Sequence, residues 1–121
     1  MTEHGSAVDT AVLGELRESV GDDPVFLAEL VDELLQDAPA QLETLRAAAT
    51  SGDAAGAGRA AHTLKGNGRT FGARELASLC QEAETAAAAG DLHAVLSRLD
   101  EIEGEWRRVC AELLVWRNDR A

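Results

Sequence analysis

The segment Ala61-His62-Thr63-Leu64-Lys65-Gly66-Asn67-Gly68 combines a helical pattern with two glycines. An interior glycine costs a helix roughly 1 kcal/mol relative to alanine, so two glycines within three residues require a reason. Gly66 lies one turn after His62 on the same helical face. Because Gly66 has no side chain, the imidazole of His62 is open to an incoming partner. The segment therefore predicts a helix that presents an accessible histidine.

This helix is one of five that the spacing of apolar residues predicts. Ser51-Gly52-Asp53 precedes it as a stop followed by an N-cap, and Gly72 ends it. It covers about residues 54–71, and its expected buried stripe is Ala57, Ala61, Leu64, Gly68 and Phe71. The other helices are expected over about residues 9–20, 24–50 and 73–89, and a last helix carries the apolar residues from Leu92 to Leu113.

Proline and aspartate residues refine the prediction of where the second helix begins and whether it is continuous. Asp23 is a good N-cap, and Pro24 suits the first helical position. Pro39 interrupts the apolar pattern, so a kink or a short break is expected near Asp37 and Ala38.

The linkers between these helices are only a few residues long, which makes successive helices antiparallel neighbours. The sequence therefore predicts an all-α fold: an antiparallel up-down four-helix bundle with a short additional N-terminal helix. A chain of 121 residues fits a single domain. We expect residues 1–8 to be a flexible N-terminus, residues 9–117 to form the domain and residues 118–121 to be a C-terminal tail.

Composition excludes several function classes. The formal net charge of −11 disfavours binding to nucleic acid or to an anionic membrane. The N-terminus lacks the features of a signal peptide, and no run of about 18 apolar residues could span a membrane. Cys80 and Cys110 each lie on an apolar helical stripe, which predicts buried thiols in a reducing cytoplasm.

Basic residues surround His62 in this acidic chain. On a helical projection Lys65 lies about 60° from His62, Arg69 about 20° and Arg59 about 60°. This local excess of positive charge suits a face that handles a phosphoryl group or docks on an acidic pocket. Gly68 falls on the core stripe, so we interpret it as a site of close packing between helices. Gly66 lies off that stripe, so this explanation does not apply to it.

A carboxylate is expected beside His62. His62 precedes Gly72 by roughly 15 Å of helix and Glu84 follows it by roughly 18 Å, so the two lie at about the same level of a helical hairpin. Glu84 could accept a hydrogen bond from Nδ1–H of His62 and leave Nε2 as the nucleophile. Gln81, one turn away, is the alternative partner.

His62-Thr63-Leu64-Lys65-Gly66, followed by Phe71-Gly72-Ala73, resembles the motif of the histidine-containing phosphotransfer (HPt) domain family. The resemblance extends from about Asp9 to Leu113. It implies that Nε2 of His62 accepts and donates a phosphoryl group, that Lys65 stabilises the phosphoryl charge or supports docking, and that Gly66 leaves room for the partner. Glu84 matches the position that holds Nδ1. Asn67 and Gly68 depart from the small hydroxyl residues of many members.

The resemblance also implies partners: response regulator receiver domains and a hybrid histidine kinase. The Mg²⁺ needed for transfer would belong to the receiver, and no intrinsic cofactor or metal site is expected. The chain lacks the glycine-rich motifs of a kinase ATP domain, so we expect a phosphocarrier without autokinase activity. Val12, Leu16 and Phe26 could form an apolar docking patch with Arg59, Arg69 and Arg74 at its rim. We expect a cytoplasmic monomer, either free-standing or cut from a longer hybrid kinase.

Three alternatives remain open from the residues alone. The chain could be an HPt-like interaction module that carries no phosphate. It could be an enzyme that uses His62 and Glu84 together, although a narrow bundle rarely offers a pocket. It could also be an obligate dimer formed through the Trp106–Trp116 end of the last helix, where Trp116 is expected to be partly exposed.

Overall fold

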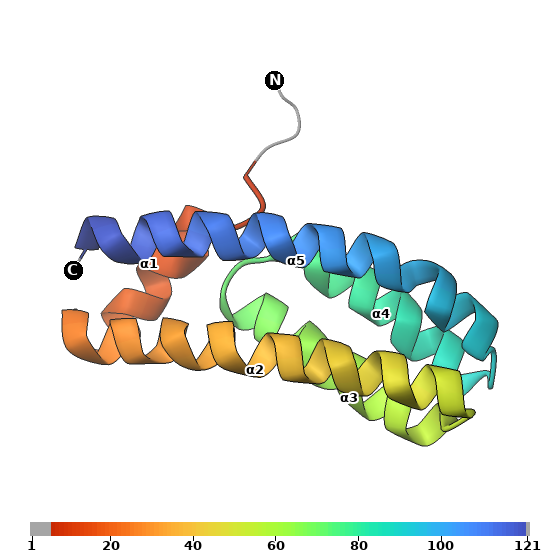
Figure 1. Ribbon diagram of the computed structural model, residues 1–121. Helices are drawn as coiled ribbons and strands as arrows, with labels where there is room; N and C mark the ends of the chain where they lie inside the picture. The colour runs from red at the N-terminus through yellow and green to blue at the C-terminus, as the bar shows by residue number, and fades with distance from the viewer. Residues whose placement is uncertain (1–5, 121) are drawn as a thin grey trace.

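The computed structural model describes residues 6–120, and within them the regular structure is entirely helical. The expected behaviour of residues 1–5 and 121 lies outside the described residues. Successive helices are joined by turns of two to four residues, and the path of the chain can be followed in Figure 1. Their bounds are α1 Thr10–Ser19, α2 Pro24–Ser51, α3 Ala54–Thr70, α4 Arg74–Ala88 and α5 Leu92–Arg120.

Aspartate side chains begin the first three helices. Asp9 accepts a hydrogen bond from the N–H of Ala11, and Asp23 accepts from those of Val25 and Phe26. Asp53 accepts from the N–H of Gly56. Each carboxylate satisfies a backbone donor that has no partner inside the helix. The sequence-based prediction of caps at Asp23 and Asp53 is confirmed.

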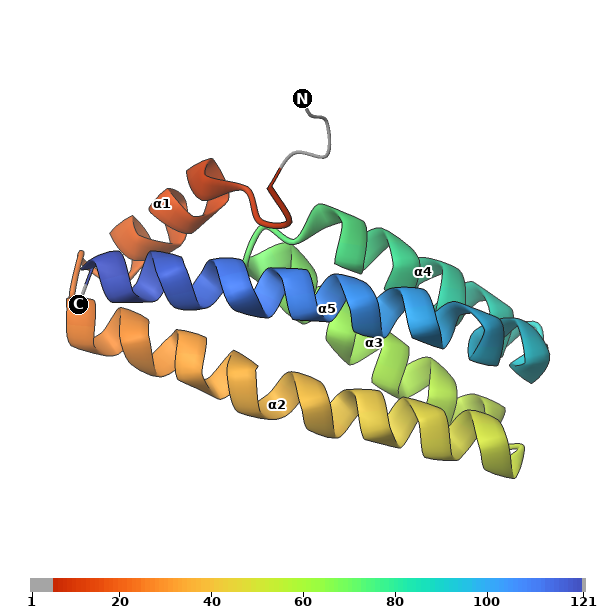
Figure 2. The ribbon, with the colours of Figure 1, turned by 45° about the horizontal axis from the view of Figure 1, so that its top comes forward.

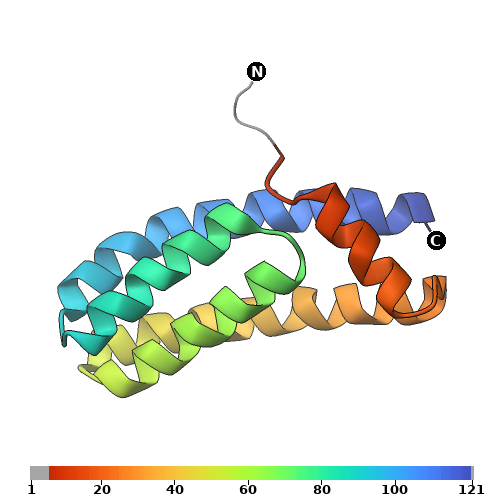
Figure 3. The ribbon, with the colours of Figure 1, turned by 180° about the vertical axis from the view of Figure 1, so that it is seen from behind.

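The helices α2 to α5 pack in a ring, in which α2 and α4 each contact both α3 and α5. Successive helices run in opposite directions along this ring (Figure 1). The helices α2 and α5 have 28 and 29 residues, whereas α3 and α4 have only 17 and 15. The longer pair therefore extends beyond the α3–α4 hairpin, and α1 crosses this extension (Figures 2 and 3).

The core lies between these helices and continues under α1. All five residues of the stripe expected on α3 are buried. The helix α4 packs against them through the buried residues Leu76, Leu79, Cys80, Ala83 and Ala87. The expectation that Trp116 is partly exposed is wrong. Its side chain is only 6% exposed because the long α5 packs it into the core.

Two expectations about the chain ends need correction. Ala7 and Val8 are buried, and their backbone N–H groups donate to the two carboxylate oxygens of Glu112 at 2.8 and 3.1 Å. The described part of the expected flexible N-terminus is thus fixed on α5. At the other end, α5 continues to Arg120, so residues 118–120 of the expected tail are helical.

Pro39 does not break α2, because the helix is continuous from Pro24 to Ser51. The expected short break near Asp37 and Ala38 is therefore wrong. Ala38, just before the proline, is buried against the core, and Pro39 itself faces outward. Packing on both sides of the proline outweighs the loss of one backbone hydrogen bond.

Gly72 lies in the turn between α3 and α4 and has a positive φ of 71°. A Cβ atom there would lie 2.9 Å from the backbone oxygen of Asp9, whose N–H donates to the carbonyl of Gly72. Gly90, with φ 75°, has a similar backbone but no atom within 4 Å of such a Cβ.

We expect Gly72→Ala to destabilise the fold by roughly 2–3 kcal/mol, as measured by urea unfolding. Gly90→Ala should cost only about 1 kcal/mol, because it has the backbone strain without the contact. Equal losses in the two variants would show that Asp9 yields freely to the added methyl group.

Candidate functional site

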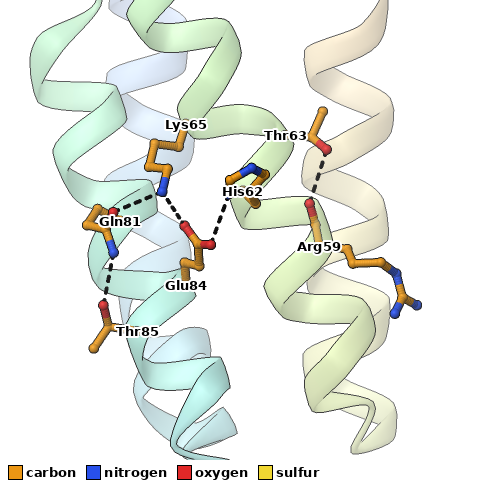
Figure 4. Close-up of polar contacts among 7 residues, drawn as sticks. All are labelled: Arg59, His62, Thr63, Lys65, Gln81, Glu84 and Thr85. Atoms are coloured by element: carbon orange, nitrogen blue, oxygen red, sulfur yellow. Dashed lines mark hydrogen bonds and ion pairs between the residues drawn. The ribbon is translucent and has the colours of Figure 1, made fainter.

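His62 lies on the outer side of the α3–α4 hairpin, with its side chain 67% exposed. Glu84 faces it from α4, and its Oε2 lies 3.0 Å from Nδ1 of His62 (Figure 4). The predicted pairing of the two side chains is confirmed. It arises because each residue lies a similar length of helix from Gly72, as the sequence indicates.

The state of Glu84 decides which ring nitrogen carries the proton. A hydrogen bond from Lys65 lowers the pKa of Glu84, burial opposes this shift, and the hydrogen bond with His62 lowers the pKa further. Glu84 is therefore ionised at neutral pH and can only accept hydrogen bonds. The proton must lie on Nδ1 of His62, which leaves the lone pair of the neutral ring on Nε2. No hydrogen bond within residues 6–120 engages Nε2.

Lys65 lies against α4 rather than beside the exposed face of the imidazole. Its side chain is only 10% exposed, and Nζ donates to Oε1 of Glu84 at 2.6 Å and to Oε1 of Gln81 at 2.9 Å (Figure 4). Gln81, expected as the alternative partner of His62, instead accepts from Lys65 and donates to Thr85. The hydrogen bond from the Lys65 ammonium group thus fixes the position of Glu84, and the hydrogen bond to Glu84 fixes the orientation of the His62 ring.

The two glycines of the motif differ as predicted. A Cβ atom at Gly66 would have no atom within 4 Å. A Cβ atom at Gly68 would lie 3.3 Å from Cβ of Ala77 and 3.2 Å from the carbonyl oxygen of Ala73. Gly68 therefore permits close packing of α3 on α4. Nothing inside the described chain explains Gly66, whose open surface lies one turn from His62.

The exposed histidine, the carboxylate on its Nδ1 and the open surface at Gly66 all lie within a segment that matches a known family. The pattern of the Hpt domain family matches residues 29–114. The chain belongs to the Hpt domain family. Its fold is similar to that of histidine-containing phosphotransfer protein B (HptB) from Pseudomonas aeruginosa PAO1, with a TM-score of 0.85 and 30% sequence identity. That similarity covers 93% of this chain and 96% of the other.

None of the curated proteins compared with the chain matches it. Membership of the Hpt domain family supports histidine phosphotransfer in a phosphorelay as the general function. Among the described residues, no three His, Cys, Asp or Glu side chains are placed to hold a metal ion. No helix in the described part of the chain is both long and apolar enough to cross a membrane.

The remaining expected site residues of this Hpt domain lie around the hairpin. Asn67 donates from Nδ2 to Oδ2 of Asp37 at 3.0 Å and so links α3 to α2. Arg69 and Arg59 are exposed on α3, whereas Arg74 is paired with Asp9. Asn67 is also one of the residues that line a groove between α1, α2 and α3. Its apolar lining includes Leu16, Leu30, Leu34, Ala40 and Phe71.

Sequence reasoning missed the role of Lys65 as a link between helices of the Hpt domain. A lysine 60° from His62 on the projection is also turned toward α4, where Gln81 and Glu84 form one turn of polar side chains. That i, i+3 pair of acceptors was the available signal. Of the two cysteines expected to be buried, Cys80 is buried, which raises the pKa of its thiol to about 12, whereas Cys110 is only half-buried; both are free thiols.

We expect Lys65→Met to raise the pKa of Glu84, measured by NMR titration of its side-chain carboxyl carbon. The folded pKa of Glu84 is depressed, so its stabilising effect is present above the unfolded value of about 4.3. That effect is lost as the pH falls through the folded pKa. Lys65→Met should therefore lower the free energy of unfolding by about 1 kcal/mol at pH 7, with a smaller difference below pH 4.

Arg98→Met provides the control, because Arg98 forms exposed ion pairs with Glu82 and Glu101. It should leave stability nearly unchanged at either pH, because solvent screens such exposed ion pairs. An unaltered titration of Glu84 in Lys65→Met would contradict the link between Lys65 and Glu84.

Proposed function

We propose that this Hpt domain carries phosphoryl groups on Nε2 of His62 between the aspartates of receiver domains. The observation that carries the proposal is the exposed imidazole whose Nδ1 is held by an ionised Glu84. This contact fixes the tautomer, and it leaves the nucleophilic nitrogen directed away from the protein.

The transfer balances without a further reactant. The Nε2 lone pair attacks the phosphorus of an aspartyl phosphate, the N–P bond forms, and the P–O bond to the aspartate breaks. The aspartate leaves as a carboxylate with the electron pair of that bond. The ring keeps its proton on Nδ1 and becomes positively charged, which the carboxylate of Glu84 stabilises. The receiver's own acidic pocket supplies Mg²⁺ for the exchange.

The phosphoryl group would enter from the receiver domain of a hybrid histidine kinase, and this chain would act as a cytoplasmic phosphocarrier without autokinase activity. The ring of contacts among α2 to α5 supports an antiparallel up-down four-helix bundle with α1 as an additional helix. Trp106 and Trp116 are buried within one chain, which supports a monomer over a dimer through that end.

The groove between α1, α2 and α3 supports receiver docking beside His62. Its lining includes five apolar residues, and it also includes Asn67, which lies on the same helix as His62. A relay intermediate must bind and release, which a small contact of this kind permits.

We expect Ala40→Glu to weaken receiver binding at least about tenfold, or by about 1.4 kcal/mol, in a calorimetric titration. Ala40 is exposed on α2 and lines the groove, so a glutamate there obstructs docking without entering the core. Ala111→Glu, at an exposed position of α5, is the matched control and should bind normally. Equal affinities in the two variants would place the docking surface elsewhere.

The experiment that tests the proposal is a two-step relay. The chain is incubated with a panel of phosphorylated receiver domains and Mg²⁺, separated from them, and then mixed with unphosphorylated receivers. The proposal requires acid-labile, base-stable phosphate on the chain in the first step and on a receiver in the second. A folded chain that binds receivers and gains no phosphate would instead be a silent interaction module.

A further inference from the structure

The site as described lacks a free positive charge for a phosphoryl group. A phosphoryl group on Nε2 of His62 carries up to two negative charges and lies close to the ionised Glu84. Lys65, which the motif resemblance assigns to phosphoryl stabilisation, is buried and already donates to Glu84 and Gln81. Moving its ammonium toward the phosphoryl group would release Glu84 and uncover a partly buried carboxylate.

Two arginines on α3 can supply the missing charge. Arg59 and Arg69 are both exposed, and neither forms an ion pair with any residue between 6 and 120. Arg74, the third basic residue expected at the rim, already pairs with Asp9 at 2.7 Å. The choice between Arg59 and Arg69 depends on their distances from His62 along the helix.

Arg59 is the nearer of the two. It precedes His62 by three residues, about 4.5 Å along the helix axis, whereas Arg69 follows by seven residues, about 10.5 Å. Residues three apart on a helix have Cβ atoms about 5–6 Å apart, within reach of an arginine. Arg59 also lines the same surface depression as His62 and Glu84, and Arg69 does not.

The conformation of Arg59 in the unphosphorylated protein is consistent with this role. Its side chain extends along the outside of α3 and away from Glu84 (Figure 4). No partner holds it there within the described residues, so a change of rotamer breaks no ion pair. A guanidinium group also matches phosphate oxygens with two parallel donors.

We propose that Arg59 contacts the phosphoryl group on phosphorylated His62. This inference rests on the proposed function, because it needs His62 to be phosphorylated. Arg59 then stabilises the charge that forms at Nε2, and the buried Lys65 acts only by positioning Glu84. The guanidinium favours the doubly charged phosphoryl group over its protonated form.

The test uses phosphoramidate, a small donor that needs no receiver: its P–N bond breaks, ammonia leaves, and the P–Nε2 bond forms. We expect Arg59→Gln to be phosphorylated about tenfold more slowly than the wild type, with Arg59→Lys in between. In a ³¹P NMR titration, the pKa of the phosphoryl group should rise by about half a unit or more in Arg59→Gln. Arg107→Gln, at an exposed position of α5, is the matched control and should leave both measurements unchanged.

The outcomes separate the two proposals. A wild-type chain that phosphoramidate does not label on His62 overturns the proposed function and this inference with it. A labelled wild type whose rate and ³¹P titration are unchanged in Arg59→Gln overturns the role of Arg59 alone. The titration distinguishes direct contact from a structural effect, because only a charge near the phosphoryl group shifts its pKa.

Discussion

A His62→Gln variant should incorporate no phosphate, from phosphoramidate or from any receiver, while it folds as the wild type does. Glutamine has no nucleophilic nitrogen with a free lone pair, so no N–P bond can form. The imidazole is largely exposed and contributes one hydrogen bond, with Glu84. Its removal should change the free energy of unfolding by less than about 1 kcal/mol.

The measurements are phosphate incorporation by mass spectrometry and thermal unfolding by circular dichroism. His93→Gln is the matched control, because His93 is an exposed histidine on α5. It should be phosphorylated as the wild type is. Phosphate retained in His62→Gln and lost in His93→Gln would move the carrier site to α5. Receiver binding in His62→Gln should persist, because docking does not depend on the nucleophile.

A Gly66→Gln variant should lose receiver-dependent transfer by about 100-fold or more and keep its reactivity toward phosphoramidate within a few-fold. A glutamine at this position projects from the open surface beside His62, where a receiver must approach and a small donor need not. A rate loss of 100-fold corresponds to about 2.7 kcal/mol of the barrier. The fold should gain about 0.5–1 kcal/mol, because glutamine is a better helix former than glycine.

The comparison of the two phosphate donors separates obstruction from damage to the site. Gly104→Gln provides the control, since Gly104 also lies inside a helix, on α5, where a Cβ atom would meet only the flexible end of Arg107, at 3.9 Å. It should gain similar helix propensity and transfer normally. Normal receiver-dependent transfer in Gly66→Gln would remove the steric explanation for this glycine. Equal losses with both donors would indicate a disturbed His62.

The features that sequence reasoning predicted correctly depend on local rules. Helix caps need only a carboxylate and the next three residues, so Asp23 and Asp53 were predictable. The pairing of His62 with Glu84 needed only the rise of a helix and the position of one turn. The buried stripe of α3 followed from the helical period.

The features that sequence reasoning missed depend on groups that are distant in the sequence or on flexible side chains. Ala7 and Val8 donate hydrogen bonds to Glu112, more than one hundred residues away, and no short sequence pattern predicts such a contact. Lys65 has a long side chain that could reach either side of α3, and only the packed position of α4 settles its direction. Trp116 belongs to the buried core, and its burial depends on how the other helices pack against the end of α5.

One consequence follows from the fact that His62, Lys65, Gln81 and Glu84 all come from a single hairpin. Their contacts join residues no more than 22 positions apart, so the reactive centre is inherited as one short stretch of sequence. The groove draws on α1 and on the first half of α2 as well, and α1 lies outside the family match. Under the proposed docking, substitutions in α1 and α2 would change which receivers are recognised and would leave the chemistry of the hairpin unchanged.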